Sequence, residues 1–404
     1  MLTVTEARER ILSHFSPTST ESISLTDSAD RVLGMDISAD GDYPPFDNSA
    51  VDGFALRSED TSASSLTLNV VADIPAGSAP TISLKPGEVA RIMTGAQIPL
   101  GADSVIPVEE TDFKERSAGT AAPKTITFSK QIRSGDNIRL RGMDIRSGEV
   151  VLEKGRTLKP QDLGLLATLG YANVTVHKKA RVALLSSGDE LLEAGATLEP
   201  GKIRDANSYS LAASIMRAGA EVIRLGVARD TRESVSRLLD KAAEEKADLI
   251  LSSAGVSVGA FDFIKEVVET NGNMDFWKVN MRPGKPLAFG EYRGTPFIGL
   301  PGNPVSAFVG FEVFVRAALG RLGGILNGSR PVVRVRSEEQ IDSDGRESYL
   351  RAVVQEENGV ITAHLTGHQG SGNLRSLVQA NALLIIPAGV KCVPAGQEVN
   401  AWVL

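Results

Sequence analysis

From residue 180 onward, apolar stretches of β type alternate with helical stretches, and this alternation restricts the possible folds more than any other feature of the sequence. Its members are residues 182–185, 207–219, 222–227, 231–245, 249–251, 261–270, 297–300 and a helix that begins at Pro304. Repeated β–α–β units indicate a doubly wound parallel sheet, and such sheets bind ligands at the carboxyl ends of their strands. We therefore predict a multidomain α/β protein with candidate ligand-binding loops after the strands.

The sequence before this sheet predicts an N-terminal helix followed by a small β domain. Thr3 and Glu6 have the spacing of a capping box and open a helix of about three turns that extends to Phe15. Short β-type runs split by Gly and Pro fill residues 66–131. A length of 404 residues with 42% hydrophobic composition is enough for about two to four such domains.

Two further segments border the sheet. A helix is expected to open at Pro160 and to end at Gly170, with proline at its start and glycine at its end. The surrounding segment, roughly 140–177, is expected to pack back on the N-terminal helix. Beyond Leu326 the sequence returns to β-type runs, which predict a small C-terminal β-barrel or sandwich.

Charge and cysteine content limit the possible partners and compartment. The formal net charge of −7 argues against attraction of the whole molecule to nucleic acid or to an anionic membrane, so any anion must be held by a local cluster. The single Cys392 excludes an intramolecular disulfide and a thiolate zinc cluster. The N-terminus lacks the pattern of an export signal, and no apolar run reaches the roughly 18 residues of a membrane span. We expect a soluble cytoplasmic protein.

Two polar loops follow strands of the predicted sheet. The first, Ser186 to Glu190, has two hydroxyls, a glycine and two carboxylates, although a turn with a helix cap would explain the same residues. The second, Ser252 to Gly259, precedes a helix, and its amides can hold a phosphate. It lacks the Gly-Lys-Ser/Thr of a Walker A motif. Asp262 beyond it could cap a helix or bind a metal.

A cationic stretch comes next. Residues 277–286 contain Lys278, Arg282 and Lys285 beside two prolines that stiffen the backbone, which suits a tetrahedral dianion. A solvated run of charges is the alternative. The loop 299–304 then leads into the last helix, and proline at the first helical position would by itself explain Pro304.

Further candidates lie outside the sheet. Asp52 stands in a loop of turn-forming residues, and residues 91–96 end a β-type run with a hydroxyl, that of Thr94. Along residues 137–144, Arg139 and Arg141 alternate so that they share one face of an extended piece, where a salt-bridged surface strand is the alternative. In the last domain Arg351 lies within a strand, and residues 366–372 form a Gly-rich loop.

The four histidines show no metal-ligand spacing, and no order of residues suggests a Ser-His-Asp or Cys-His triad. Hydrolysis by a nucleophile of the protein is therefore disfavoured. The remaining carboxylates, cations and Gly-rich loops are suited to positioning phosphates, Mg²⁺ and an oxyanion.

Five segments, taken in order, resemble the MoeA family and the E domain of gephyrin along nearly the whole chain. They are residues 45–53, 91–96, 187–190, 255–259 and 300–304. The resemblance implies a homodimer whose site is shared between subunits. It also implies four domains, which we assign to residues 1–45 with 140–177 (elongated and discontinuous), 46–139 (small, β-rich and inserted), 178–326 (doubly wound and molybdopterin-binding) and 327–404 (β-barrel).

The resemblance further implies a set of site residues. The catalytic group would consist of Asp52, Thr94, Glu190, Asp230 and Asp262, of which the last three would orient Mg²⁺. The substrate-binding group would consist of Arg139, Asp144, Ser187, Gly188, Asp189, Gly255, Ser257, Gly259, Lys278, Arg282, Lys285, Pro301, Asn303, Arg351 and Ser371. Two positions depart from the family: Arg282 stands where many relatives have lysine, and Ala254 replaces a common glycine.

The activity that the resemblance implies is the insertion of molybdate into adenylated molybdopterin with release of AMP, the last step in making molybdenum cofactor. Its partners would be these two substrates, a second copy of the chain and other proteins of cofactor biosynthesis. Two alternatives remain open. Molybdopterin adenylyltransferases use the same type of α/β domain, although the extra β domains argue against that activity. A non-catalytic cofactor carrier or scaffold is the other.

Overall fold

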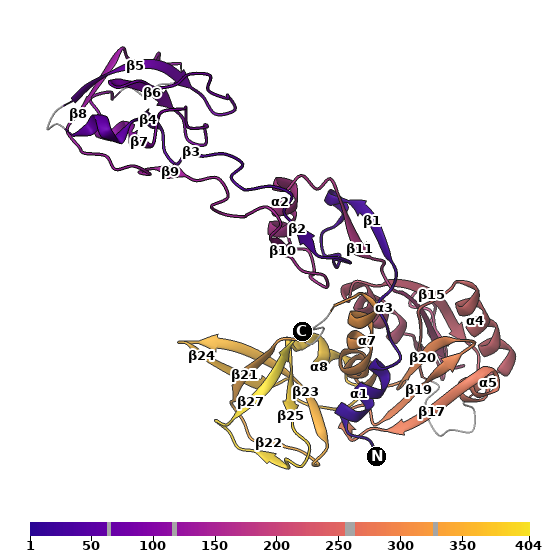
Figure 1. Ribbon diagram of the computed structural model, residues 1–404. Helices are drawn as coiled ribbons and strands as arrows, with labels where there is room; N and C mark the ends of the chain where they lie inside the picture. The colour runs from indigo at the N-terminus through magenta and orange to yellow at the C-terminus, as the bar shows by residue number, and fades with distance from the viewer. Residues whose placement is uncertain (63–65, 115–118, 255–262, 326–329) are drawn as a thin grey trace. The chain divides into compact units, whose positions relative to one another are not determined.

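The computed structural model describes residues 1–62, 66–114, 119–254, 263–325 and 330–404 (Figure 1). The chain forms two compact units. The larger consists of Met1–Met35, Lys154–Gly164 and Ala172–Leu404, and the smaller of Asp36–Glu153 and Leu165–Tyr171. Within the described ranges, no helix combines the length and the apolar character needed to cross a bilayer.

The smaller unit is built on a five-stranded sheet with the order β7-β4-β6-β5-β8. Its strands are β4 (Gly53–Leu56), β5 (Leu66–Ile74), β6 (Glu88–Ile92), β7 (Ser104–Pro107) and β8 (Thr125–Phe128). Successive side chains of β4 point to opposite faces, so Phe54 and Leu56 enter one apolar cluster and Ala55 enters another. Two short pairs complete the unit: β2 (Ile37–Ser38) with β10 (Val150–Leu152), and β3 (Asn48–Ser49) with β9 (Ile138–Arg139).

The N-terminal helix α1 (Val4–Leu12) begins with the predicted capping box. The Glu6 amide donates to the Thr3 hydroxyl at 3.1 Å, and the Thr3 amide donates to the Glu6 carboxylate at 2.8 Å. The helix is shorter than predicted, yet Phe15 beyond its end still reaches the same core. This core is that of the α/β sheet, because Ala7 and Ile11 of α1 are buried against it.

The segment 140–177 was expected to pack on α1. Instead, its last strand pairs with β1, the strand that follows α1. Strand β1 (Thr20–Ser24) is antiparallel to β11 (Asn173–His177), and α2 (Pro160–Thr168) precedes β11. The prediction failed here because the apolar face of α1 fits the larger core of the α/β domain, and the extended segment satisfies its backbone groups by strand pairing.

The doubly wound domain is confirmed. Its sheet has the order β15-β12-β16-β20-β19-β17. The strands are β12 (Arg181–Ser187), β15 (Glu221–Ala228), β16 (Leu249–Ser253), β17 (Gly272–Lys278), β19 (Pro286–Tyr292) and β20 (Thr295–Leu300). The helices are α3 (Asn207–Arg217), α4 (Arg232–Glu244), α5 (Phe263–Asn271), α6 (Pro304–Gly310), the π-helical segment η4 (Phe311–Val315) and α7 (Arg316–Leu322).

One strand departs from the predicted parallel arrangement. Strands β15, β12, β16 and β20 are parallel, whereas β19 runs antiparallel to both β20 and β17. From the sequence, residues 277–286 are a cationic stretch with two stiffening prolines, and the hairpin whose strands flank this stretch is not predicted. The buried side chains of Leu287 and Phe289 are what extend the sheet there.

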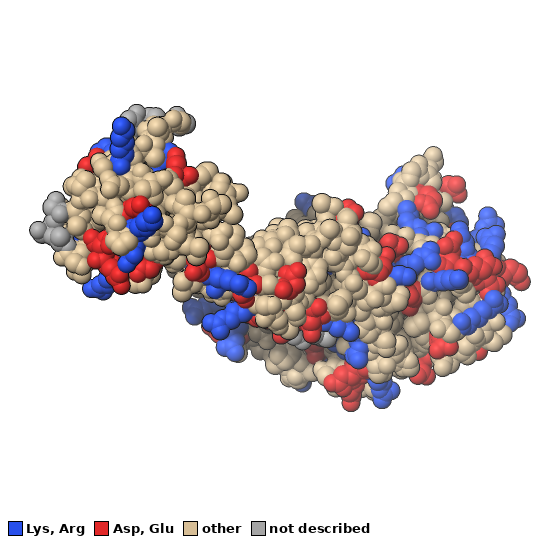
Figure 2. All heavy atoms as spheres, turned by 45° about the horizontal axis from the view of Figure 1, so that its top comes forward, with Lys and Arg blue, Asp and Glu red and all other residues tan. Residues whose placement is uncertain are grey.

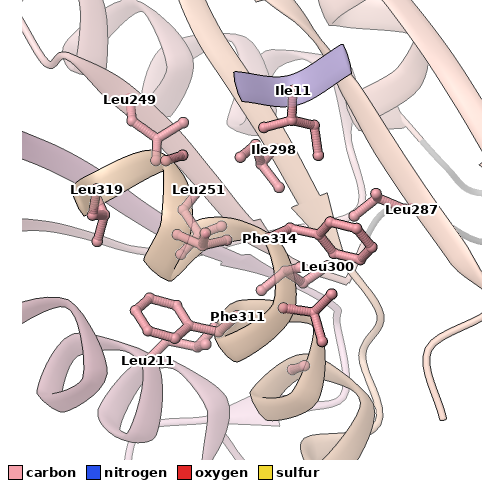
Figure 3. Packing of buried hydrophobic residues seen from close by; sticks show 14 of the residues in the cluster. Ile11, Leu211, Leu249, Leu251, Leu287, Ile298, Leu300, Phe311, Phe314 and Leu319 are labelled. Atoms are coloured by element: carbon pink, nitrogen blue, oxygen red, sulfur yellow. The ribbon is translucent and has the colours of Figure 1, made fainter. Parts of the chain in front are cut away.

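Helices cover both faces of this sheet. Leu249 and Leu251 of β16 point into a cluster with α1, α3 and the α6–α7 segment, as the close view in Figure 3 shows. Ile250 points to the opposite face, against α4 and α5. Each such buried side chain contributes about 1.5–3 kcal/mol to folding, and this packing holds the strand ends, and hence their loops, in place.

The C-terminal domain is the predicted barrel. Strands β23, β24, β21, β27 and β25 pair in turn, and β25 pairs again with β23, which closes the ring. Their bounds are β21 (Val332–Ser337), β23 (Glu347–Glu357), β24 (Val360–Leu365), β25 (Ala382–Ile386) and β27 (Glu398–Val403). The same domain has the smaller elements β22 (Ile341–Asp342), β26 (Cys392–Val393) and α8 (Leu374–Gln379). Three short strands lie earlier in the chain: β13 (Leu191–Leu192), β14 (Ile203–Arg204) and β18 (Met281–Arg282).

Figure 2 shows the charged side chains on one face of the molecule. On the face that Figure 2 shows, Lys and Arg alternate with Asp and Glu among the described residues instead of forming one continuous patch of either sign. This distribution agrees with the expectation that anions are held by local clusters.

Candidate active site

The loop after β12 brings three predicted residues together at the carboxyl edge of the sheet. The Ser187 hydroxyl donates to the Asp230 carboxylate at 2.9 Å, and Asp230 lies two residues beyond the end of β15. The amides of Asp189 and Asp230 donate to each other's carboxylates at 3.4 and 3.3 Å. Because β12 and β15 are parallel neighbours, their ends meet at this edge, as the sequence predicted.

Gly188 is required at its position. Its φ of +151° lies in a region that side chains rarely adopt, and a Cβ there would stand within 2.8 Å of the Glu190 carboxylate atoms. The absence of a side chain therefore lets the carboxylate of Glu190 lie over the backbone at the end of β12. Asp189 and Glu190 are both exposed, so their carboxylates are accessible to a ligand.

Asn207, at the start of α3, connects two further loops. Its Nδ2 donates to the Ser253 hydroxyl and to the Gly302 carbonyl, both at 2.7 Å, and its buried Oδ1 has no hydrogen-bond partner among the described residues. The loop after β16 is thereby joined to the loop 301–303, which contains Pro301 and Asn303. The sequence predicts Asn207 only as a helix start, and the polar residues Asp205, Asn207 and Ser208 before an apolar helix were the available signal for more.

Part of the second loop lies outside the described ranges. The predicted residues Gly255, Ser257, Gly259 and Asp262 all fall there. The last described residue before them is Ala254, which has a φ of +74°. A non-glycine residue in this left-handed region is strained, which gives a physical reason why glycine is favoured at this position.

The cationic stretch lies beside the barrel. Lys278 ends β17 and is exposed, as is Lys285, whereas Arg282 is half-buried in β18. Strand β18 pairs with β23 so that Arg282 lies opposite Ser348, three residues before Arg351. The sheet pairing therefore brings two predicted cations, Arg282 and Arg351, into one region.

Arg351 is fully enclosed and contacts the Gly-rich loop. Its guanidinium donates to the carbonyls of residues 368, 369 and 370 at 3.0–3.3 Å, and its Nε donates to the Ser376 hydroxyl at 3.0 Å. No carboxylate of the described residues pairs with it. Burial lowers the pKa of Arg351 to about 10, and the nearby Arg282 acts in the same direction. Arg351 therefore remains charged at neutral pH and shapes the loop, and its predicted contact with substrate stays a prediction.

The same loop is attached to the last helix. The Val305 amide of α6 donates to the Ser371 carbonyl at 3.0 Å. Residues 301–305, Ser371 and the enclosed Arg351 thus form one connected region between the sheet edge and the barrel. Pro304 occupies the first turn of α6, as predicted.

The remaining predicted residues belong to the smaller unit. Asp52 accepts hydrogen bonds from both the amide and the hydroxyl of Thr94, at 2.7 and 2.8 Å, and both residues are exposed. Asp52 also borders a cavity of about 720 Å³ that includes Phe54, Arg91 and Met93. The sequence predicted this pair only through the family motif, because 42 residues separate its members.

Arg139 and Asp144 form an exposed ion pair at 2.6 Å in the same unit. Arg139 lies in β9, opposite Asn48 of β3. Arg141 lies beyond the end of β9, where its guanidinium pairs with Asp42 at 2.7 Å, so it does not continue a strand with Arg139. Both arginines therefore form surface salt bridges, which is the alternative that the sequence offered for this segment.

The oxygen atoms at the end of β12 and β15 are chemically suited to Mg²⁺. Mg²⁺ prefers carboxylate, hydroxyl and water oxygens. Asp189 and Asp230 supply carboxylates in the same hydrogen-bonded group as the Ser187 hydroxyl, and the Glu190 carboxylate lies over Gly188. Within the described ranges no three His, Cys, Asp or Glu side chains gather into a metal cluster, and the third predicted ligand, Asp262, lies outside those ranges. The described residues therefore offer oxygen donors of the type that Mg²⁺ prefers, but they do not by themselves form a metal site of three carboxylates.

The fold and these loops define a multidomain α/β protein that presents carboxylates, hydroxyls and cations at the carboxyl edge of a doubly wound sheet. Three family models match the chain: the MoeA N-terminal region (domain I and II) over residues 2–170, a probable molybdopterin binding domain over residues 183–321, and the MoeA C-terminal region (domain IV) over residues 334–404.

Named relatives extend over the same length. The chain is 38% identical to molybdopterin molybdenumtransferase 2 of Mycobacterium tuberculosis strain H37Rv over 94% of each chain. It is also 38% identical to the molybdopterin molybdenumtransferase of Haemophilus influenzae, over 99% of this chain and 98% of that one. The crystal structure of the molybdopterin biosynthesis MoeA protein from Pyrococcus horikoshii OT3 matches all of both chains with a TM-score of 0.85 and 31% identity. This chain belongs to the MoeA family.

Proposed function

We propose that this chain is a molybdopterin molybdenumtransferase, which inserts molybdate into adenylated molybdopterin and releases AMP. The observation that carries the proposal is the joined set of carboxylates and hydroxyls at the ends of β12 and β15, in a chain that belongs to the MoeA family over nearly its whole length. Its relatives bear the name of this activity. A polyanionic substrate calls for positioning and charge stabilisation, which these residue types supply.

The carboxylates and hydroxyls would act on the pyrophosphate of the substrate. Glu190 and Asp230, with Asp262, would hold Mg²⁺, which neutralises part of the pyrophosphate charge when it is bound. Ser187 keeps the Asp230 carboxylate in one orientation through its hydrogen bond. Asp52 and Thr94 would complete the catalytic group, with Arg139 and Asp144 beside the substrate.

The cations would act on molybdate. Lys278, Arg282 and Lys285 are positioned on or between the strands β17, β18 and β19, so their backbone is fixed by the sheet and barrel. Ser371 and the loop 301–303 supply hydrogen-bonding groups nearby. Arg351 would contribute its charge from behind the loop that it shapes, because a buried cation that pairs with no carboxylate of the described residues raises the positive potential around it.

Several finer features belong to the same proposal. They are the four-domain division, the use of Mg²⁺, a homodimer that shares its site between subunits, and residence in the cytoplasm. In such a homodimer, Asp52 and Thr94 of one subunit would lie beside the sheet-edge loops of the other subunit.

A reconstitution tests the function. The purified chain is mixed with adenylated molybdopterin, Mg²⁺ and molybdate, and AMP and finished cofactor are measured together over many turnovers. We expect both products to appear at equal rates. Pyrophosphate release from ATP and metal-free molybdopterin would indicate an adenylyltransferase instead. Retention of one pterin per chain without AMP would indicate a carrier.

Gly188→Ala should lower the rate in this assay by at least about tenfold. The added methyl group requires a strained φ, which costs about 1–3 kcal/mol, and it displaces the Glu190 carboxylate. Gly195→Ala is the matched control, because a Cβ at Gly195 meets nothing within 4 Å and the residue lies in the same connecting segment. Equal rates in the two variants would show that the position of Glu190 does not matter for turnover.

A further inference from the structure

A second cavity, of about 440 Å³, lies at the opposite edge of the α/β sheet. Lys178 and Lys179, which line it, join β11 to β12, and Ala220 of the lining directly precedes β15. The cavity is therefore at the amino ends of the parallel strands. The seven residues of β12 place it about 20 Å from the loops of the candidate active site. All of its lining residues belong to the larger compact unit.

The lining is strongly cationic. Its charged residues are one carboxylate, Asp30, and five cations: Arg31, Lys159, Lys178, Lys179 and Arg217. Lys159 pairs with Asp30 at 2.8 Å, and Arg31 pairs with Glu21 at 2.5 Å. Among the described residues, no carboxylate lies within ion-pair distance of Lys178, Lys179 or Arg217. The neighbouring residues 326–329 contain no ionisable side chain. Three cations at this cavity therefore have no carboxylate partner in the part of this acidic chain that the structure describes.

A buried histidine also belongs to the cavity lining. The side chain of His177 is 5% exposed, and its Nδ1 lies 2.8 Å from the Thr18 carbonyl. Because a carbonyl only accepts, Nδ1 carries the proton. Nε2 is buried and has no hydrogen-bond partner among the described residues. Buried polar atoms are normally paired, so Nε2 is an unsatisfied acceptor in a side chain that contributes to the cavity lining.

Most of the remaining lining residues are apolar, with Thr157 as the exception. Val32, Leu319 and Ala220 are buried there, and Met216 is exposed. An apolar wall together with unpaired cations fits an organic molecule that carries a phosphate, because the cations bind the anion and the wall covers the organic part. The carboxyl end of α3 would by itself favour a cation at Arg217. It does not explain Lys178 and Lys179, which are not on a helix.

We propose that this cavity binds a phosphorylated small molecule, with Lys178, Lys179 and Arg217 holding the phosphate. The site is separate from the proposed catalytic function and does not depend on it. No part of it requires a residue of the candidate active site.

The histidine signals of the full-length protein provide a local test. The chain has only four histidines, so the ring resonances of labelled protein can be assigned, with His177→Gln identifying those of His177. Phenyl phosphate, which combines a phosphate with an apolar ring, is the probe. We expect a saturable shift of the His177 signals, and inorganic phosphate at matched ionic strength should bind at least about threefold more weakly. Equal binding of both would overturn the role of the apolar wall.

Variants then test the cations. Lys178→Gln with Lys179→Gln should weaken binding of phenyl phosphate at least about tenfold, because two charge-assisted contacts are lost. The matched control is Arg237→Gln with Lys241→Gln, which removes two exposed cations of α4 outside the cavity and should leave binding unchanged. The proposal is overturned if His177 does not respond up to about 10 mM probe. It is also overturned if both double variants weaken binding equally.

Discussion

Replacement of Asp52 by alanine is expected to slow AMP release by about 10²-fold or more while leaving the fold intact. The Asp52 carboxylate is exposed and is held in place by the amide and hydroxyl of Thr94. Removal of one preorganised group that acts on a charged transition state typically costs about this factor in kcat. The fold should tolerate the change because water can replace the carboxylate at the exposed Thr94 amide.

The measurement is single-turnover AMP release, with circular dichroism as a check of folding. Glu59→Ala is the control in the same unit, since Glu59 is an exposed carboxylate whose ion pair with Arg57 adds little stability. Normal turnover of Asp52→Ala would remove this residue from the mechanism.

Replacement of Glu312 by alanine should lower the stability of the larger unit by about 3 kcal/mol. The side chain of Glu312 is 1% exposed, in the π-helical segment η4, and it accepts hydrogen bonds from Arg316 and Arg330 at 2.6 Å. Arg330 also donates to the carbonyl of Val403 at 2.7 Å, so the carboxylate connects the helical segment to the barrel. Removing one member of a buried ionic group leaves uncompensated charge, which costs about 3–5 kcal/mol.

Tryptophan fluorescence during urea unfolding reports this loss, because both tryptophans, Trp277 and Trp402, lie in the larger unit. Glu244→Ala on α4 is the control, since Glu244 is exposed and near the end of its helix. A midpoint of the Glu312→Ala transition equal to that of the control would contradict the expectation.

Low pH should weaken the ion pairs of Glu312 with Arg316 and Arg330. Burial alone raises the pKa of Glu312, but hydrogen bonds from Arg316 and Arg330 outweigh it, and the net pKa is lowered. A carboxylate whose pKa is lower in the folded chain stabilises the fold above the pKa of the unfolded chain, about 4.3, and this contribution is lost as the pH falls through the folded value. The stability difference between the wild type and Glu312→Gln should therefore shrink below about pH 4.

Local sequence patterns were sufficient to predict most elements of the α/β domain. The apolar runs that became β12, β15, β16 and β20 are short, continuous and separated by amphipathic helices, and a strand buried on both faces needs such a run. The hairpin β17–β19 escaped prediction because its strands enclose a charged stretch that also reads as a loop. The packing of α1 on the sheet core depends on contacts with residues more than 200 positions away.

The candidate site divides in the same way. The position of Ser187, Asp189 and Glu190 at a strand end follows from topology alone, because parallel strands all end at one edge. Their hydrogen bonds with Asp230 do not, since 43 residues separate Ser187 from Asp230. The hydrogen bonds by which Asn207 joins two loops depend on side-chain geometry in the folded chain. The same is true of the carbonyls that enclose Arg351.

By itself, the sequence determined which segments are helical or extended, where polar loops follow strands, and to which family the chain is similar, because periodicity, turn residues and motifs are properties of neighbouring residues. The tertiary structure decided which distant side chains meet: Asp52 with Thr94, Glu312 with two arginines, and the lysines around the second cavity. Burial and hydrogen bonding act through space, so the partners of a side chain are set only when the whole domain has packed.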